Sequence, residues 1–202
     1  MKRNGGARQR SHVPYQCGET LAALVAGHSV FQGGASSCIA GFSLERVWQH
    51  SLQTAIAARA IALHEKQYAV RTEEAFLAGL LHEVGKVVYA TRSAVVNDPA
   101  ASDEDTVAQM EAHHAEVGAY LLGLWGFPNS IVEAVAFHHQ PSRASGDGFG
   151  LAGLIHVANR LVHEREAQET VPSDSSIEPG YLDKLGLTDH VPQWSAALAA
   201  LH

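Results

Sequence analysis

Histidines placed inside apolar helical segments constrain this chain more than any other feature. The sequence holds 13 histidines in 202 residues, and five of them lie in segments whose other residues are largely apolar. An imidazole that is buried without a partner costs free energy, because its nitrogens lose their hydrogen bonds to water. The five rings must therefore meet around a bound species or be satisfied one by one. They are His50, His82, His114, His138 and His139, and Glu83 directly follows His82.

Apolar residues recur at helical spacing over most of the chain. From Leu44 to about His64 they repeat every three or four residues, which predicts an amphipathic helix. Thr72 and the two acids after it predict the start of a second helix, since a threonine cap and early negative charge stabilise that end. We expect this second helix to run through His82 and Glu83 to about Gly85.

Further helices are expected in the second half of the chain. Ser102 and Asp105 predict the start of one that runs to about Trp125. Pro128 predicts the next, which would carry the pair 138–139. No segment shows the apolar–polar alternation of a strand, so we expect an all-α fold, an irregular helical bundle. The remaining predicted helices cover residues 19–30, 151–166 and 194–201.

Composition is that of an ordinary globular protein, with 46% hydrophobic and 17% charged residues. The formal charge of −7 argues against a general nucleic-acid binder, and no apolar run reaches the roughly 20 residues that span a bilayer. Cys17 and Cys38 match no metal or redox spacing, so a reduced, cytoplasmic protein is expected. We expect a disordered basic leader at 1–13, a helical domain at 14–166, and a flexible segment with a short helical tail at 167–202.

The spacing of the histidines and the glutamate is typical of a metal site. Adjacent residues on a helix diverge by about 100°, so His82 and Glu83 would reach one ion only at the helix edge. Other ligands would then come from neighbouring helices, and His50, His114 and the pair 138–139 each fall on a different predicted helix. Imidazole and carboxylate together suit Mn, Fe, Ni, Co or Zn. The alternative is a set of buried histidines that hydrogen-bond across helices.

Several short motifs occur in order between residues 48 and 141. They are Trp48-x-His50-Ser51-Leu52, Gly79-Leu80-Leu81-His82-Glu83-Val84-Gly85-Lys86, Glu111…His114-Ala115-Glu116-Val117-Gly118-Ala119, Trp125-Gly126-Phe127-Pro128 and His138-His139-Gln140-Pro141. In spacing and order they resemble the HDOD family, a bacterial signal-transduction branch of the HD phosphohydrolase superfamily. The resemblance covers roughly residues 18–163 and implies an HD-type helical bundle. Members usually carry several more helices before the part matched here, so the chain resembles a truncated member, a fragment, or a half completed by another chain.

The resemblance also implies metal ligands. In related HD enzymes the residues equivalent to a first group of four bind a metal ion. In the HD-GYP relatives, which hydrolyse cyclic dinucleotides, the residues equivalent to a second group of three complete a second metal site. The first group corresponds to His50, His82, Glu83 and the position of Asn159, and the second to His114, His138 and His139.

Two departures from the family pattern weaken an enzymatic site. Glu83 stands where the family has aspartate, and its extra methylene displaces the carboxylate by about 1.5 Å. Asn159 stands where an enzyme would carry aspartate, so a neutral carbonyl replaces an anion. Two divalent ions would then be compensated by Glu83 alone, which is poor in a buried site. The Gly-Tyr-Pro signature of the HD-GYP branch is also missing after His139. We expect a single transition-metal ion (Fe, Mn, Co or Zn), held by His50, His82, Glu83 and Asn159, or none.

The expected function is that of a regulatory, non-catalytic module in bacterial signalling, which acts through contacts to signalling proteins. The alternative is a metal-dependent phosphohydrolase acting on a nucleotide or phosphoester, with Lys86 as the phosphate anchor. A simpler role for Lys86 is an ion pair with Glu83, three residues earlier.

Trp48 and Trp125 are expected in the core. The missing helices would leave apolar surface, so a homo-oligomer or completion by another chain is expected, with no nucleic-acid or membrane partner.

Overall fold

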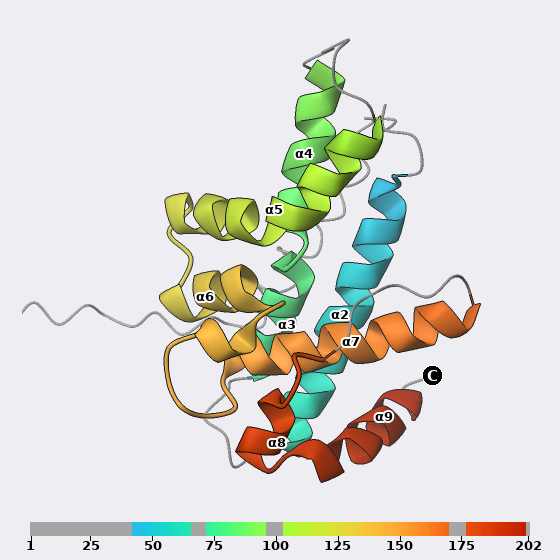
Figure 1. The fold of residues 1–202 in the computed structure, drawn as a ribbon, viewed down its shortest axis with the longest axis vertical. Coiled ribbons are helices and arrows are strands. Elements are labelled where there is room, and N and C mark those ends of the chain that lie inside the picture. Colours follow the sequence, from blue (N-terminus) through green and yellow to red (C-terminus); the bar gives the residue numbers. More distant parts are fainter. Residues whose placement is uncertain (1–41, 66–71, 96–102, 170–176, 201–202) are drawn as a thin grey trace, which may run out of the picture.

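The structure is a computed structural model that describes residues 42–65, 72–95, 103–169 and 177–200 (Figure 1). Within these ranges all regular structure is helical, which confirms the predicted fold class. The expected leader at 1–13, the predicted helix at 19–30, both cysteines and the predicted cap Ser102 lie outside the described residues.

The helix α2, Leu44–His64, lies at the centre of the fold and has the predicted bounds. Its first turn is capped by Ser43, whose Oγ accepts a hydrogen bond from the Arg46 backbone N–H at 3.3 Å. One face of α2 packs against α3 and α7, and α9 packs near its end. Trp48 is 8% exposed on this helix, so its predicted place in the core is confirmed.

Small residues bring α2 and α3 (Thr72–Leu81) into close contact. A Cβ atom added at Gly79 would lie 2.7 Å from the Cα atom of Ala55, which is closer than real Cβ contacts. Glycine is therefore required at this crossing, and the end of α3 is held directly against α2.

The second predicted helix ends earlier than expected. The helix α3 ends at Leu81, and α4, Val84–Val95, begins after a two-residue turn formed by His82 and Glu83. The prediction of one continuous helix to about Gly85 was therefore wrong. The physical reason is that neighbouring residues on a helix point about 100° apart, whereas His82 is 0% exposed and Glu83 is 2% exposed. The turn allows both side chains to face the interior.

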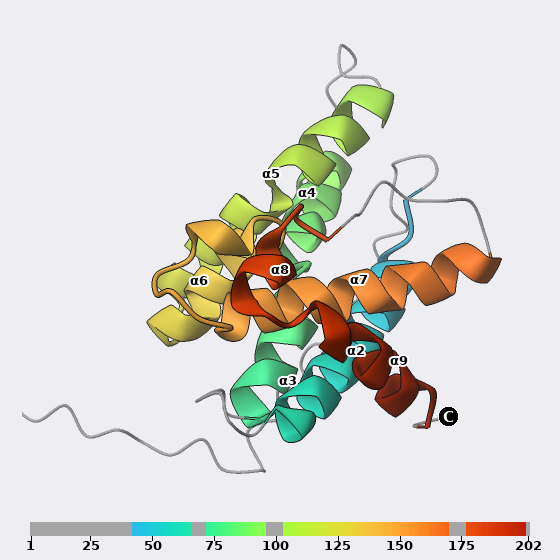
Figure 2. The ribbon, with the colours of Figure 1, turned by 60° about the horizontal axis from the view of Figure 1, so that its bottom comes forward.

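Three helices complete the shell around this turn. They are α5 (Asp103–Leu124), α6 (Asn129–Phe137) and α7 (Leu151–Glu169), and α7 crosses the molecule beside α2 and α3 in both views (Figures 1 and 2). Trp125 follows the end of α5 and is 61% exposed, so its predicted place in the core was wrong. The chain turns at Gly126, which has a φ of +76°, and this turn leaves the indole outside the helix contacts.

The C-terminal residues pack onto α2. The helices α8 (Tyr181–Leu185) and α9 (Val191–Ala199) are joined by a 3₁₀ turn, Thr188–His190. Trp194 is fully buried, and its indole N–H donates to Glu65 Oε1 at 2.9 Å. The short helix predicted around Trp194 is thus present, and Figure 2 shows α9 in front of α2. None of the described helices is both long enough and apolar enough to cross a bilayer.

Candidate metal centre

The fold brings the predicted ligands together from five elements. His50 comes from α2, the adjacent His82 and Glu83 from the turn after α3, and His114 from α5. The pair 138–139 follows the last residue of α6, and Asn159 lies on α7. Except for His139, each of these residues is at most 8% exposed.

Three buried imidazoles have their orientation fixed by main-chain carbonyls. The Nδ1–H of His82 donates to Gly79 O at 2.7 Å, and that of His138 donates to Val135 O at 2.8 Å. His114 Nδ1 likewise lies 3.0 Å from Glu111 O. Because a carbonyl oxygen can only accept, the proton of each neutral ring resides on Nδ1. The Nε2 atom of each ring therefore presents a lone pair, which is how histidine ligands are prepared for a metal.

The inner triad, His114, His138 and His139, has the spacing of a metal site. The Nε2 atoms of His114 and His138 are 3.4 Å apart, and those of His114 and His139 are 3.1 Å apart. Two nitrogen ligands bound tetrahedrally at 2.0–2.1 Å are separated by about 3.4 Å. The lone pairs of His114 and His138 face each other with no hydrogen between them, so a cation placed there would remove a repulsion. The inner triad therefore fits a divalent transition metal.

Glu83 lies between the inner triad and His82. Its Oε1 atom is 3.7 Å from His114 Nε2 and 3.5 Å from His82 Nε2, so the carboxylate faces both groups despite its extra methylene. Among the described residues, His82 Nε2 has no hydrogen-bond partner. A buried nitrogen that is left unsatisfied is costly, and a metal ion or a bound ligand would supply the missing contact.

Lys86 makes the expected ion pair with Glu83. Its Nζ atom lies 3.0 Å from Glu83 Oε2 and 2.9 Å from Glu111 Oε1, and the side chain is 13% exposed. Burial alone would raise the pKa of Glu83, but the positive charge of Lys86 opposes it, and the pKa lies well below its usual value. Glu83 is therefore an anion at neutral pH.

Burial also favours the neutral form of His82, His138 and His139. It lowers the pKa of His82 to about 3 and that of His139 to about 4, and it holds the pKa of His138 well below its usual value. Neutral imidazole is the form that binds metals, so no proton has to be displaced from these rings near pH 7.

Two residues of this region were missed from the sequence. Glu166 places both carboxylate oxygens 3.1 Å from His50 Nδ1, and His163 stacks on the ring of His50 with centroids 4.3 Å apart. They follow Asn159 by four and seven residues, which is one face of α7. That spacing was the available signal. Asn159 itself lies as predicted beside His50, with Oδ1 2.8 Å from Nε2.

A pocket of about 430 Å³ opens beside these groups. Its wall includes His50, Glu83, Lys86, Arg46 and Glu166. The pocket gives a small molecule or an ion access to His50 and His163, and its wall carries two cationic and two anionic side chains.

The fold and the histidine centre define an HD-type helical domain. The model of the HDOD domain family matches residues 18–141, and the chain belongs to this family. A protein of Shewanella amazonensis, provisionally assigned as a metal-dependent phosphohydrolase, has a similar structure, with a TM-score of 0.59 at 16% identity, covering 89% of this chain and 68% of the other. An HDOD domain protein of unknown function from Geobacter sulfurreducens gives 0.55 at 18% identity, over 91% and 68% of the two chains. At these identities the likeness concerns the fold.

Two curated relatives match over part of their length. A ribonuclease Y of Geobacter sulfurreducens is 29% identical over 117 residues, which is 58% of this chain and 18% of the relative. An uncharacterised protein of Treponema pallidum is 25% identical over 129 residues, covering 58% and 25%. The chain thus spans a quarter or less of the length of either relative.

Proposed function

We propose that this HDOD domain is a non-catalytic signalling module of the bacterial cytoplasm that holds one divalent transition metal and acts through contacts to other proteins. Fe, Mn, Co or Zn would suit the ligands. The observation that carries the proposal is the inner triad, in which the Nε2 atoms converge. The rings of His114 and His138 are held in this orientation by hydrogen bonds from their Nδ1 atoms to main-chain carbonyls. The ion would lie within reach of the Glu83 carboxylate, which supplies one negative charge.

A second ion in the HD position is not supported by the charges. That position would draw on His50, His82 and the neutral amide of Asn159, with Glu83 as its anion. Glu83 is already paired with Lys86 and would be shared with the first ion. Since two buried divalent ions need several anionic ligands, the site favours one ion and argues against two-metal hydrolysis.

A phosphohydrolase remains the second candidate, and the pocket is the observation that favours it. Arg46 and Lys86 line the pocket next to Glu83, so a phosphoester could reach the centre and meet positive charge. A bound ion would supply a nucleophilic hydroxide or polarise the phosphoryl oxygen. In this case Lys86 would hold the phosphate.

Metal content tests the first candidate. Protein purified without chelator or nickel affinity should contain an equivalent of Fe, Mn, Co or Zn that the His114→Ala variant lacks. His113→Ala is the matched control, because the adjacent His113 side chain is 57% exposed and lies outside the inner triad. Equal metal content in the wild-type chain and in His114→Ala, or no metal in either, would refute the metal-binding role of the inner triad.

Hydrolysis of phosphoesters separates the two candidates. We expect the metal-loaded chain to show no turnover of nucleotides, cyclic dinucleotides or a chromogenic phosphodiester. Turnover that disappears in both His114→Ala and Lys86→Ala would establish the phosphohydrolase instead. The Asn159→Asp variant restores the missing anion, and it is the form in which activity should emerge if only charge is lacking.

A further inference from the structure

We propose that His50, His163 and Glu166 form a second metal site, the outer cluster, which takes a divalent transition metal from the pocket. The outer cluster shares no ligand with the inner triad and goes beyond the proposed function. His163 and Glu166 lie three residues apart on α7, and His50 faces them from α2. One ligand atom from each residue lies within 4.8 Å of the other two.

The hydrogen bond of His50 to Asn159 determines which nitrogen is available. His50 Nε2 is 2.8 Å from the amide oxygen of Asn159, which can only accept, so this nitrogen carries a proton. In the neutral ring the Nδ1 atom then has a lone pair, and this lone pair faces the two oxygens of Glu166 at 3.1 Å. A lone pair facing a carboxylate is repulsive unless a positive species lies between them. The arrangement therefore requires either a second proton on His50 or a cation.

The neighbouring His163 favours the cation. Its Nδ1 atom is 3.5 Å from Glu166 Oε2, so a second imidazole converges on the same carboxylate. The two rings are stacked with an interplanar angle of 29°, and the Nδ1 atom of each lies within 3.5 Å of Glu166 Oε2. A proton on His50 would bridge only His50 and Glu166, whereas one ion would contact all three residues. Two imidazoles and one carboxylate form a ligand set known for zinc and for non-haem iron.

Access distinguishes the outer cluster from the inner triad. The side chains of His163 and Glu166 are 25% and 43% exposed, and all three residues line the pocket. His114 and His138, in contrast, are at most 1% exposed. An ion in the outer cluster would keep open coordination positions toward the pocket, so it should exchange faster than the inner ion. In this chain Asn159 is a positioning residue, because its amide oxygen orients His50 toward Glu166.

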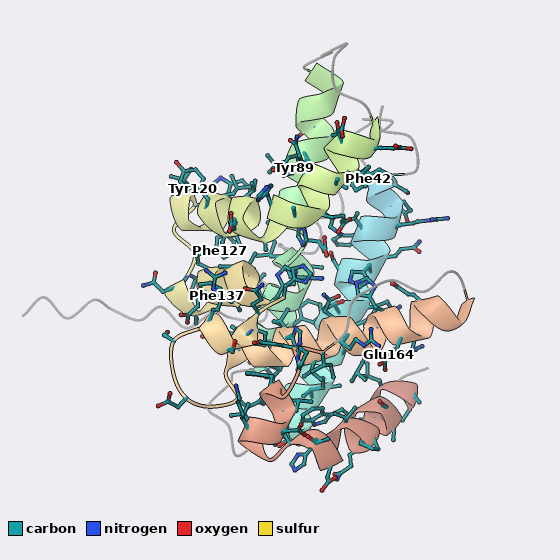
Figure 3. All side chains as sticks on the ribbon, in the orientation of Figure 1. Phe42, Tyr89, Tyr120, Phe127, Phe137 and Glu164 are labelled. Atoms are coloured by element: carbon teal, nitrogen blue, oxygen red, sulfur yellow. The ribbon has the colours of Figure 1, made fainter. Side chains whose placement is uncertain are left out.

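Cobalt titration of the chelator-stripped full chain tests the outer cluster, because Co²⁺ reports its ligands by visible absorption. The wild type should bind two equivalents, and the weaker one should bind at least about 10-fold less tightly in Glu166→Gln and in His163→Ala. His114→Ala should lose only the other equivalent. Glu164→Gln is the matched control: Glu164 lies on the same helix (Figure 3) and pairs with Arg160 at 2.9 Å, so both equivalents should be retained.

The outcomes separate this proposal from the proposed function. A wild type that binds one equivalent, lost in His114→Ala and unchanged in Glu166→Gln, would overturn the outer cluster and leave the inner site intact. One equivalent lost only in Glu166→Gln and His163→Ala would support the outer cluster and refute the inner site. Because Glu166 is partly exposed, Glu166→Gln should melt within a few degrees of the wild type, so a lost equivalent would not reflect unfolding.

Discussion

At the scale of single residues, the contact between Gly85 and His114 holds the metal centre together. A Cβ atom at Gly85 would overlap the carbonyl oxygen of His114 and lie 2.9 Å from the backbone nitrogen of Gly118. Neither backbone atom can move without displacing α5. Glycine at this position therefore lets the turn that carries His82 and Glu83 approach the helix that carries His114.

Substituting Gly85 should damage both stability and metal binding. We expect Gly85→Ala to destabilise the fold by about 3 kcal/mol, because overpacking against backbone cannot relax through a side chain. Gly123→Ala is the control, since a Cβ atom there meets nothing within 4 Å and alanine is the better helix former. Urea unfolding and metal content measure both effects. Equal stability of Gly85→Ala and the wild type would contradict the close contact.

At the scale of elements, Glu65 attaches the C-terminal helix to α2. Its buried carboxylate accepts from Trp194 Nε1 at 2.9 Å and lies 2.7 Å from His190 Nδ1, and His64 Nδ1 is 3.1 Å away. Burial alone would raise the pKa of Glu65, but the hydrogen bonds from His190, Trp194 and His64 outweigh it and lower the pKa below 4.5. The charged form of the carboxylate is therefore the form that stabilises α9.

This attachment should weaken in acid. A carboxylate whose pKa is lowered by folding adds stability above its unfolded pKa, here about 4.5, and that stability is lost as the pH falls through the folded pKa. At pH 7 we expect Glu65→Gln to be less stable by about 1–2 kcal/mol in urea unfolding. The difference from wild type should shrink below pH 4.5. A difference that stays constant with pH, as expected for the exposed control Glu164→Gln, would show that the charge of Glu65 has no part in it.

At the scale of the whole molecule, exposed apolar side chains gather at the C-terminal end of α5. Tyr120 is 72% exposed, Leu124 67% and Trp125 61%, and they are among the few large hydrophobic residues exposed in the described ranges. Tyr120 and Leu124 are four residues apart and so share one face of α5. Figure 3 shows Tyr120 at the outer side of that helix. Apolar surface of this kind favours association.

The chain is therefore expected to self-associate through this end of α5. Light scattering at increasing concentration should give a mass above 21.6 kDa. The double variant Leu124→Ser, Trp125→Ser should return the mass toward the monomer, because polar side chains remove the apolar contact. Leu63→Ser is the control, since Leu63 is 51% exposed on α2. A wild type that stays monomeric, or a double variant of unchanged mass, would refute the association.

The sequence by itself determined the all-α class, the extent of α2 and the residue types of the centre. The spacing of apolar residues predicted α2 with its observed bounds, because helix periodicity is a local property of the chain. The motifs pointed to His50, His82, Glu83 and the inner triad, and the structure brings these side chains within a few ångströms of one another.

Only the tertiary structure decided where helices end and which side chains meet. The break after Leu81 follows from burying both His82 and Glu83, and the exposure of Trp125 follows from the turn at Gly126. Glu166 lies 116 residues from His50 along the chain, so their contact depends on how α2 and α7 cross. Local sequence carries no information on such a crossing, because it is determined by the packing of the entire core.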